Sequence, residues 1–287
     1  MRGTRLWVII GLIATALIAA GCGGDDDDDG GGTTETTGAS GDFETIQEGV
    51  LTVGTDAPYP PFLIGTPEDP NFTGYEIELF NAIAEKIGYP DPEYSNTNFA
   101  AVFRDTANGL FDIAVVSSTI LPERERVVDF TDPHYEAQQA LLVPEGSDIA
   151  SVDDLSGAIV GAQDGTTGEK YANDETGASE VRGFPQGPDA ITALVTGQVD
   201  ATIIDQPVAA DAVEKQGGMV IAEEIQTDEL YGFPVAPDND GLREAVNAAL
   251  AELKKDGTVD ELYEKYFSTA PPESVASGDP NPLLTND

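Results

Sequence analysis

One arginine follows a group of hydroxyl residues at the end of an apolar run. Residues 111–116 (FDIAVV) predict a buried strand, and Pro122 suits the first turn of a following helix. Ser117, Thr119 and Arg124 would then lie where the strand gives way to the helix. Backbone N–H groups, hydroxyls and a guanidinium at such a junction can converge on a carboxylate. The spacing therefore predicts a carboxylate receptor, whereas the alternative is a surface helix whose PERER charges are only solvated.

Other polar residues also stand at predicted strand ends. Thr166 and Thr167 follow Gly165 at a strand-to-helix turn, where hydroxyl and N–H groups could bind the same carboxylate or simply cap the helix. Asp205 ends the apolar run ATIID, and a buried carboxylate is costly without a partner, which could be a ligand or the cap of the helix opening at Pro207.

Short apolar strands alternate with amphipathic helices from residue 43 to residue 267, which predicts an α/β fold built on parallel sheets. The expected strands are 51–55, 111–116, 158–162 and 201–204. The expected helices are 76–87, 99–107, 167–174, 188–196, 207–215 and 241–254. Ligands of open α/β sheets bind beyond the carboxyl ends of the strands, where the polar residues above would gather.

Five motifs in order make the chain resemble one family. They are GTDAPYPPF (54–62), TILPER (119–124), DFTDPHY (129–135), GAQDGTT (161–167) and VDATIIDQP (199–207). Together they are similar to the extracellular solute-binding proteins, family 3, which deliver polar amino acids to ABC importers. The resemblance implies the two-lobed, type II periplasmic-binding-protein fold, with two mixed, mostly parallel sheets flanked by helices and joined by two hinge crossings.

The resemblance also implies the domain limits. The crossings would be the extended segments 138–143 and 230–235, so that lobe 1 is 43–137 plus 236–267 and lobe 2 is 138–235. The ligand would lie between the lobes and be held by hinge closure.

The resemblance further suggests the roles of the site residues. Arg124, with Thr119 and the backbone of Ser117, would bind the carboxylate of an amino acid, and Asp205 would bind its ammonium group. Arg126 lies two residues further along and would face elsewhere on a helix. Thr167 and Thr166 would add to the carboxylate site from the second lobe.

Four more residues would form the side-chain pocket: Asp56, Tyr59, Phe99 and Gln163. An aspartate there favours a basic or amide side chain and repels an acidic one, while Tyr59 and Phe99 could instead be core aromatics. Glu76 stands where aspartate is usual, Gln163 where some relatives carry lysine, and the sole histidine, His134, where tyrosine is usual. We interpret His134 as a loop substitution and expect no catalytic residue, metal site or cofactor.

The N-terminal region predicts export. Residues 1–21 carry two arginines and an apolar run of signal-peptide length, and Cys22 follows small residues as in a lipoprotein, although an ordinary signal peptide is the alternative. Residues 22–42 lack core-forming residues and predict an acidic, disordered tether; the run of five aspartates at 25–29 lacks the spacing of a calcium loop. Residues 268–287 predict a disordered tail. We therefore expect an extracytoplasmic monomer anchored by lipid to the cell membrane.

The formal net charge of −40 excludes nucleic acid as a partner and suits a protein kept soluble in high salt, although ordinary acidic proteins share this composition. No GxxxxGK[ST] motif occurs, so the expected partners are an ABC permease and a separate ATPase subunit. The rival function is a cleft enzyme of the same fold, such as a cyclohexadienyl dehydratase. A transglycosylase domain or a receptor's sensing domain fits less well.

Overall fold

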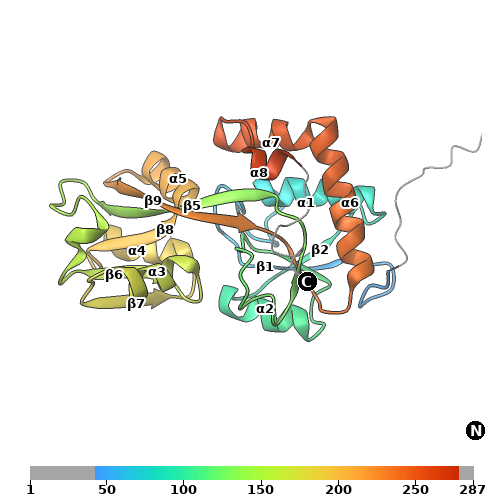
Figure 1. The fold of residues 1–287 in the computed structure, drawn as a ribbon, viewed down its shortest axis with the longest axis horizontal. Coiled ribbons are helices and arrows are strands. Elements are labelled where there is room, and N and C mark those ends of the chain that lie inside the picture. Colours follow the sequence, from blue (N-terminus) through green and yellow to red (C-terminus); the bar gives the residue numbers. More distant parts are fainter. Residues whose placement is uncertain (1–42, 278–287) are drawn as a thin grey trace, which may run out of the picture. The chain divides into compact units, whose positions relative to one another are not determined.

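The computed structural model describes residues 43–277, which fold around two five-stranded sheets (Figure 1). The predicted signal peptide, Cys22, the tether and residues 278–287 lie outside the described residues. No helix within residues 43–277 is both long enough and apolar enough to span a membrane.

The first sheet combines four strands from the N-terminal part of the described chain with one strand that follows the second sheet. Its strands are β1 (Thr52–Thr55), β2 (Glu93–Asn96), β3 (Ile113–Val115), β4 (Asp129–Phe130) and β10 (Pro234–Val235). In space they run β2-β1-β3-β10-β4, with β1 parallel to β2 and β3, and β10 antiparallel to β3 and β4. The helices of this part are α1 (Tyr75–Lys86), α2 (Phe99–Ala107), α6 (Asp240–Asp256), α7 (Thr258–Phe267) and α8 (Glu273–Ala276). Helices α1 and α2 lie on opposite sides of the sheet in Figure 1.

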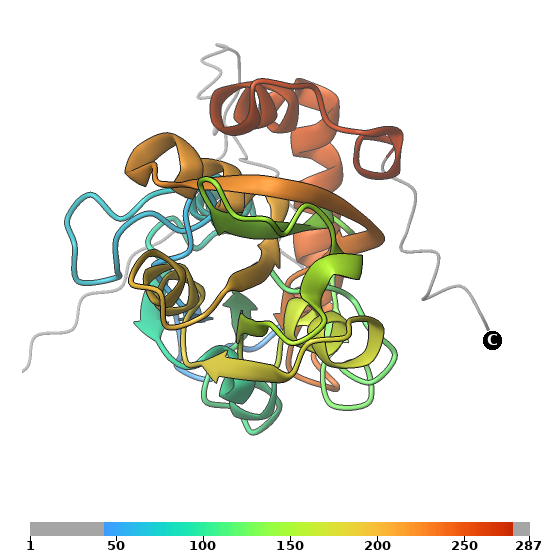
Figure 2. The ribbon, with the colours of Figure 1, turned by 90° about the vertical axis from the view of Figure 1, so that its left-hand side faces the viewer.

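The second sheet has the order β7-β6-β8-β5-β9. Its strands are β5 (Tyr135–Pro144), β6 (Ile159–Gln163), β7 (Glu180–Phe184), β8 (Ala201–Asp205) and β9 (Met219–Tyr231). The segments between them form the 3₁₀ helix η1 (Val152–Leu155) and helices α3 (Thr167–Glu175), α4 (Gly187–Val195) and α5 (Gln206–Gln216). Strands β7, β6 and β8 are parallel. Helix α3 connects β6 to β7 and α4 connects β7 back to β8, so right-handed crossovers place the two helices on opposite sides of the sheet, as Figure 2 shows. Both sheets are therefore mixed, as the sequence predicts.

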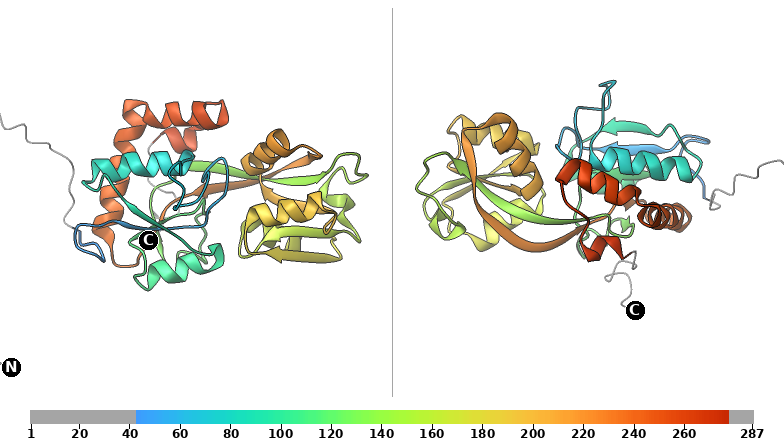
Figure 3. Two further views of the ribbon diagram at one scale, coloured as in Figure 1. Left: turned by 180° about the vertical axis from the view of Figure 1, so that it is seen from behind. Right: turned by 90° about the horizontal axis from the view of Figure 1, so that it is seen from above.

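Strands β5 and β9 connect the two sheets. They pair antiparallel from Tyr135 and Tyr231 at one end to Pro144 and Met219 at the other, and both views of Figure 3 show them running side by side. The predicted crossings were 138–143 and 230–235. The observed β5 begins earlier, at Tyr135, and β9 already ends at Tyr231.

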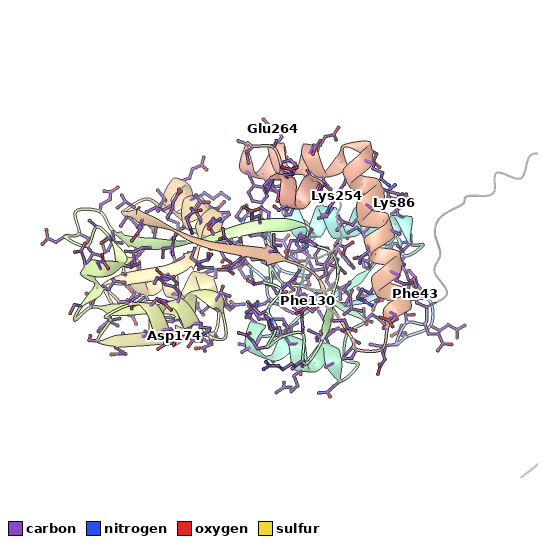
Figure 4. All side chains as sticks on the ribbon, viewed as in Figure 1. Phe43, Lys86, Phe130, Asp174, Lys254 and Glu264 are labelled. Atoms are coloured by element: carbon purple, nitrogen blue, oxygen red, sulfur yellow. The ribbon has the colours of Figure 1, made fainter. Side chains whose placement is uncertain are left out.

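Aromatic rings fill the core where this strand pair meets the first sheet. Phe62 packs against Tyr135 with ring centroids 4.9 Å apart, and against Tyr231 at 5.8 Å. Phe130, labelled in Figure 4, is fully buried in the same part of the fold. On the outer face Lys86 reaches the carboxylate of Glu252 on α6 at 3.2 Å (Figure 4). Large buried rings of this kind stabilise the packing of β5 and β9 against the first sheet.

Two expectations were wrong. The residues after Pro122 form a hydrogen-bonded turn and no helix, because only Glu125 and Val128 make a helix-type bond before the chain enters β4. Residues 268–277, predicted to be disordered, contain α8, whose Val275 is fully buried. Composition alone missed this anchor because one apolar residue is enough to dock a single helical turn.

Candidate functional site

A small cavity lies at the carboxyl ends of β1, β3, β6 and β8, where ligands of open α/β sheets bind. It is lined by Asp56, Tyr59, Phe99, Val116, Ser117, Thr119, Arg124, Gln163, Thr166, Thr167, Asp205 and Tyr231. The structure thus brings together all ten residues that the sequence predicts for ligand binding, and adds Val116 and Tyr231. Its free volume is about 20 Å³, on the scale of one water molecule, so a larger ligand needs the walls to move apart.

Arg124 lies in the wall of this cavity and is only 8% exposed. Its guanidinium donates to the carbonyl of Thr119 at 2.9 Å and to the carbonyl of Gly165 at 3.1 Å. It also lies over the rings of Phe99 and Phe103, with distances of 5.2 and 4.8 Å from Cζ to the ring centroids. Arg126, by contrast, is exposed, which agrees with the preference for Arg124.

The charge of Arg124 is balanced only indirectly. Among the residues that the structure describes, no carboxylate lies within ion-pair distance of it. Burial lowers the pKa of Arg124 to about 10, although more distant acids such as Glu229 oppose the shift. Since a buried charge is costly unless it is paired, the arrangement suits an anion that enters the cavity.

Ser117 is held in an unusual backbone conformation beside Arg124. Its φ of 49° is in the left-handed region, which is strained for a residue with a Cβ. Its backbone N–H and its hydroxyl both donate to one oxygen of Glu76, at 2.8 and 3.0 Å. The other oxygen of Glu76 lies 2.8 Å from Nε2 of His134. His134 is in a loop, as predicted, but it is fully buried and stacks on Phe233.

The three threonine hydroxyls differ in what they can offer a ligand. Thr166 caps α3, because its hydroxyl accepts from the N–H of Glu169 and donates to the carbonyl of Gln163. Thr119 and Thr167 instead donate to a carboxylate oxygen of Glu229, at 2.5 and 2.8 Å. Their oxygens therefore keep only lone pairs for other groups.

Asp205 occupies the N-cap position of α5, as the alternative predicts, but its side chain makes no capping hydrogen bond to the helix. Its side chain accepts from the hydroxyl of Tyr59 and, at 2.6 Å, from the amide of Gln139. Burial, and then repulsion from Glu229, raise the pKa of Asp205 from 3.8 to about 6. A cationic group brought to this carboxylate would lower its pKa again.

Asp56 directly follows β1 and lines the cavity. It accepts from the amide of Gln163 at 2.6 Å, a bond that joins the first sheet's side of the site to the second. Gln186 lies 3.4 Å away and was not predicted. Burial raises the pKa of Asp56, against these hydrogen bonds. Tyr59, the predicted pocket residue, belongs both to the aromatic core and to the cavity wall, so both of its proposed roles coexist.

Sequence reasoning missed three buried polar residues around the cavity: Gln139, Glu229 and Tyr231. Tyr231 lines the cavity, and its buried hydroxyl interacts with the carboxylate of Asp205. The sequence signal was weak, because Gln139 lies inside β5, and Glu229 and Tyr231 lie in the last three residues of β9, at the edge of a segment that the sequence predicted only as a crossing between lobes.

The fold and the site define a two-lobed binding protein of the type II periplasmic-binding-protein class. The model of the bacterial extracellular solute-binding proteins, family 3, matches residues 51–269, so the chain belongs to this family. The ABC transporter glutamine-binding protein GlnH of Bacillus subtilis is 30% identical over 268 residues, which are 92% of this chain and 97% of that protein.

Two solved structures are also similar. An ancestral arginine-binding protein bound to arginine is 38% identical, with a TM-score of 0.72, over 77% of this chain and 99% of that one. The ancestral amino acid-binding protein AncCDT-1, a precursor of cyclohexadienyl dehydratase, is 36% identical, with a TM-score of 0.70, over 76% of this chain and 96% of that one. The named relatives are amino-acid-binding proteins, and membership of an extracellular family implies an extracytoplasmic location.

Proposed function

We propose that this protein binds a basic or amide-bearing amino acid between its two lobes and delivers it to an ABC permease. The observation that carries the proposal is the buried guanidinium of Arg124, which has no ion-pair partner among the described residues and lies in the cavity wall. A ligand carboxylate can take two parallel hydrogen bonds from a guanidinium, which makes this pair strong and directional.

The ammonium group of the ligand would bind opposite the carboxylate. Asp205 supplies the charge, and the oxygen of Thr119 supplies an acceptor, because its proton is donated to Glu229. This changes the role of Thr119 from the predicted carboxylate donor to an ammonium acceptor. The carboxylate then depends on Arg124 together with the backbone N–H groups at the start of α3, near Thr167.

The ligand's side chain would reach Asp56. The acids that line the cavity, Asp56 and Asp205, outnumber its one arginine, so a ligand with a positive side chain is favoured and an acidic one is repelled. The amides of Gln163 and Gln186 lie beside Asp56 and would hydrogen-bond the same polar side chain. The relatives named for arginine and glutamine bind ligands of these two kinds.

The larger frame of the proposal follows the family. Lobe 1 would comprise 43–137 and 236–267, lobe 2 would comprise 138–235, and β5 and β9 would bend as the lobes close. The sheet membership of the strands supports this division, apart from the first residues of β5, which belong to the second sheet, and from β10, which belongs to the first sheet although residues 234–235 fall in lobe 2. Cleavage of residues 1–21 and lipidation of Cys22 would anchor the monomer to the membrane through the tether.

The test is calorimetric titration of the mature chain, with Cys22 replaced by serine, against the twenty amino acids. We expect saturable binding of arginine, lysine, histidine, glutamine or asparagine. Arg124→Met should abolish detectable binding, whereas Arg126→Met, which alters an exposed arginine two residues away, should leave it unchanged. Equal binding by the two variants would refute the carboxylate assignment.

A second function is favoured by one comparison only, the similarity to a precursor of cyclohexadienyl dehydratase. Mass spectrometry of the ligand recovered after incubation distinguishes the two. A binding protein returns its ligand unchanged, whereas dehydration of a cyclohexadienyl carboxylate would establish the enzyme.

A further inference from the structure

Glu229 is a buried acid beside the cavity to which the proposed function gives no contact with the ligand. It lies near the end of β9, opposite Ala137 of β5, and is only 5% exposed. Its carboxylate accepts three hydrogen bonds, from the hydroxyls of Thr119 and Thr167 and, at 3.1 Å, from the amide of Gln139. These donors come from the loop after β3, the start of α3 and strand β5. One side chain on a connecting strand thus binds groups from both sides of the cavity.

Glu229 also shapes the charge of the site. The amide of Gln139 bonds both to Glu229 and to Asp205, so the two acids share one donor. The titratable groups that face Glu229 are Asp205, Tyr59, Tyr231 and Arg124. Its negative charge raises the pKa of Asp205, after the larger effect of burial. Two neighbouring acids favour a cation between them and disfavour an uncharged group.

The direction of the hydroxyl bonds matters as much as the charge. A carboxylate has only lone pairs, so Thr119 must use its single proton to reach Glu229. What Thr119 offers to the cavity is then an acceptor, which attracts an ammonium group and rejects a second acceptor. The oxygen of Thr167 is further occupied, because it also accepts from Gln139 at 3.2 Å.

We propose that Glu229 is a positioning residue for recognition of the ligand's ammonium group, acting by holding the hydroxyl of Thr119 as an acceptor and by adding negative charge behind Asp205. The proposal rests on the proposed function and makes that function more specific. Glu229 need not contact the ligand. Its effect should be confined to ligands that carry an α-ammonium group.

The experiment compares two pairs of probes by calorimetry. L-arginine is compared with 5-guanidinopentanoic acid, and L-glutamine with 5-amino-5-oxopentanoic acid; each acid keeps the carboxylate and the side chain but lacks the α-ammonium group. Glu229→Gln keeps the shape of the side chain and removes its charge. Glu224→Gln, at an exposed position of the same strand, is the matched control.

We expect Glu229→Gln to weaken binding of the amino acid about tenfold or more, and to leave binding of the des-amino acid unchanged or tighter. Glu224→Gln should change neither. Thr119→Val, which removes the hydroxyl and keeps the shape, should show the same selective loss and serves if Glu229→Gln does not fold, as judged by its thermal melting.

Three outcomes would overturn the inference. Equal losses of affinity for the amino acid and its des-amino analogue would show that Glu229 has only a structural role. An unchanged affinity for the amino acid would show that Glu229 has no role in recognition. A wild-type protein that binds neither amino acid would refute the proposed function itself, and the inference with it. If the wild-type protein binds the amino acid but Glu229→Gln does not selectively lose affinity for it, the inference is refuted and the proposed function is not.

Discussion

Ligand affinity should depend on pH through Asp205, whose carboxyl group has a pKa raised from 3.8 to about 6 by burial and by Glu229. An ammonium group binds the ionised carboxylate, so any proton on Asp205 must leave when the ligand enters. With a pKa of about 6, roughly nine-tenths of Asp205 is ionised at pH 7 and roughly one-tenth at pH 5. Affinity should therefore fall about tenfold from pH 7 to pH 5, with release of about 0.9 proton per ligand at pH 5.

Titration calorimetry at pH 7 and pH 5, in two buffers with different ionisation enthalpies, measures both the affinity and the proton release. Asp205→Asn is the control, since it should bind weakly at both values and release no proton from this position. Asp56 also has a raised pKa, so Asp56→Asn, which keeps Asp205, should retain most of the effect. Equal affinity at both pH values without proton release would refute the reasoning.

The same group affects the stability of the unliganded protein in the opposite sense. Because the folded-state pKa of Asp205 is raised, its favourable contribution is complete below pH 3.8 and is lost as the pH rises through about 6. The loss corresponds to about 3 kcal/mol at pH 7, an upper figure for a buried group that keeps its hydrogen bonds. Asp205→Asn should consequently melt at a higher temperature than wild type at pH 7, even though it binds ligand poorly. A lower melting temperature would show that the hydrogen bonds of this carboxylate outweigh its cost of burial.

Three further perturbations test other parts of the structure. Asp56→Asn should weaken arginine binding about tenfold or more and glutamine binding less, because only arginine loses an ion pair; calorimetry with both ligands measures the difference, and equal losses would contradict the assignment. Glu76→Gln should weaken binding because one amide oxygen cannot replace the carboxylate that holds Ser117 and faces His134; unchanged affinity would show that Ser117 keeps its conformation unaided. Val275→Ala should destabilise the fold by about 2 kcal/mol in urea unfolding, whereas no change would mean that α8 is not docked.

The sequence correctly predicted those elements that have both an apolar pattern and a clear signal for their first or last residue. Helix α2 begins at Phe99 because Asn98 accepts from the N–H of Ala100, and the predicted and observed limits coincide. Strand β7, in contrast, was missed because its residues are polar or only half buried. Helix α7 was missed because the prediction ended at Lys254, before Gly257 turns the chain through a left-handed conformation into a second helix.

Most of the cavity lining could be predicted because ligand sites of α/β proteins lie at the carboxyl ends of parallel strands. Residues such as Asp56 and Asp205 directly follow parallel strands, and the ends of parallel strands meet. Glu229 gave no such signal. It lies near the end of β9, where the more buried residues alternate with more exposed ones from Ile225 to Tyr231. From the sequence alone, an acid in a strand is expected to face solvent, so the alternation did not identify Glu229 as an inward residue.

Two of the three residues that depart from the pattern expected of the family, Glu76 and His134, contact each other. Each looked like an isolated change in the sequence, one a longer acid and the other a ring nitrogen in place of a hydroxyl. In the structure the Nε2–Oε1 distance is 2.8 Å, both side chains are fully buried, and the second oxygen of Glu76 holds the strained Ser117. A longer carboxylate needs a partner of different reach, and a planar imidazole stacked on Phe233 supplies one. Because the two side chains are in contact beneath the ligand site, their effects should not be additive, and changing either residue alone should cost more affinity than exchanging both together.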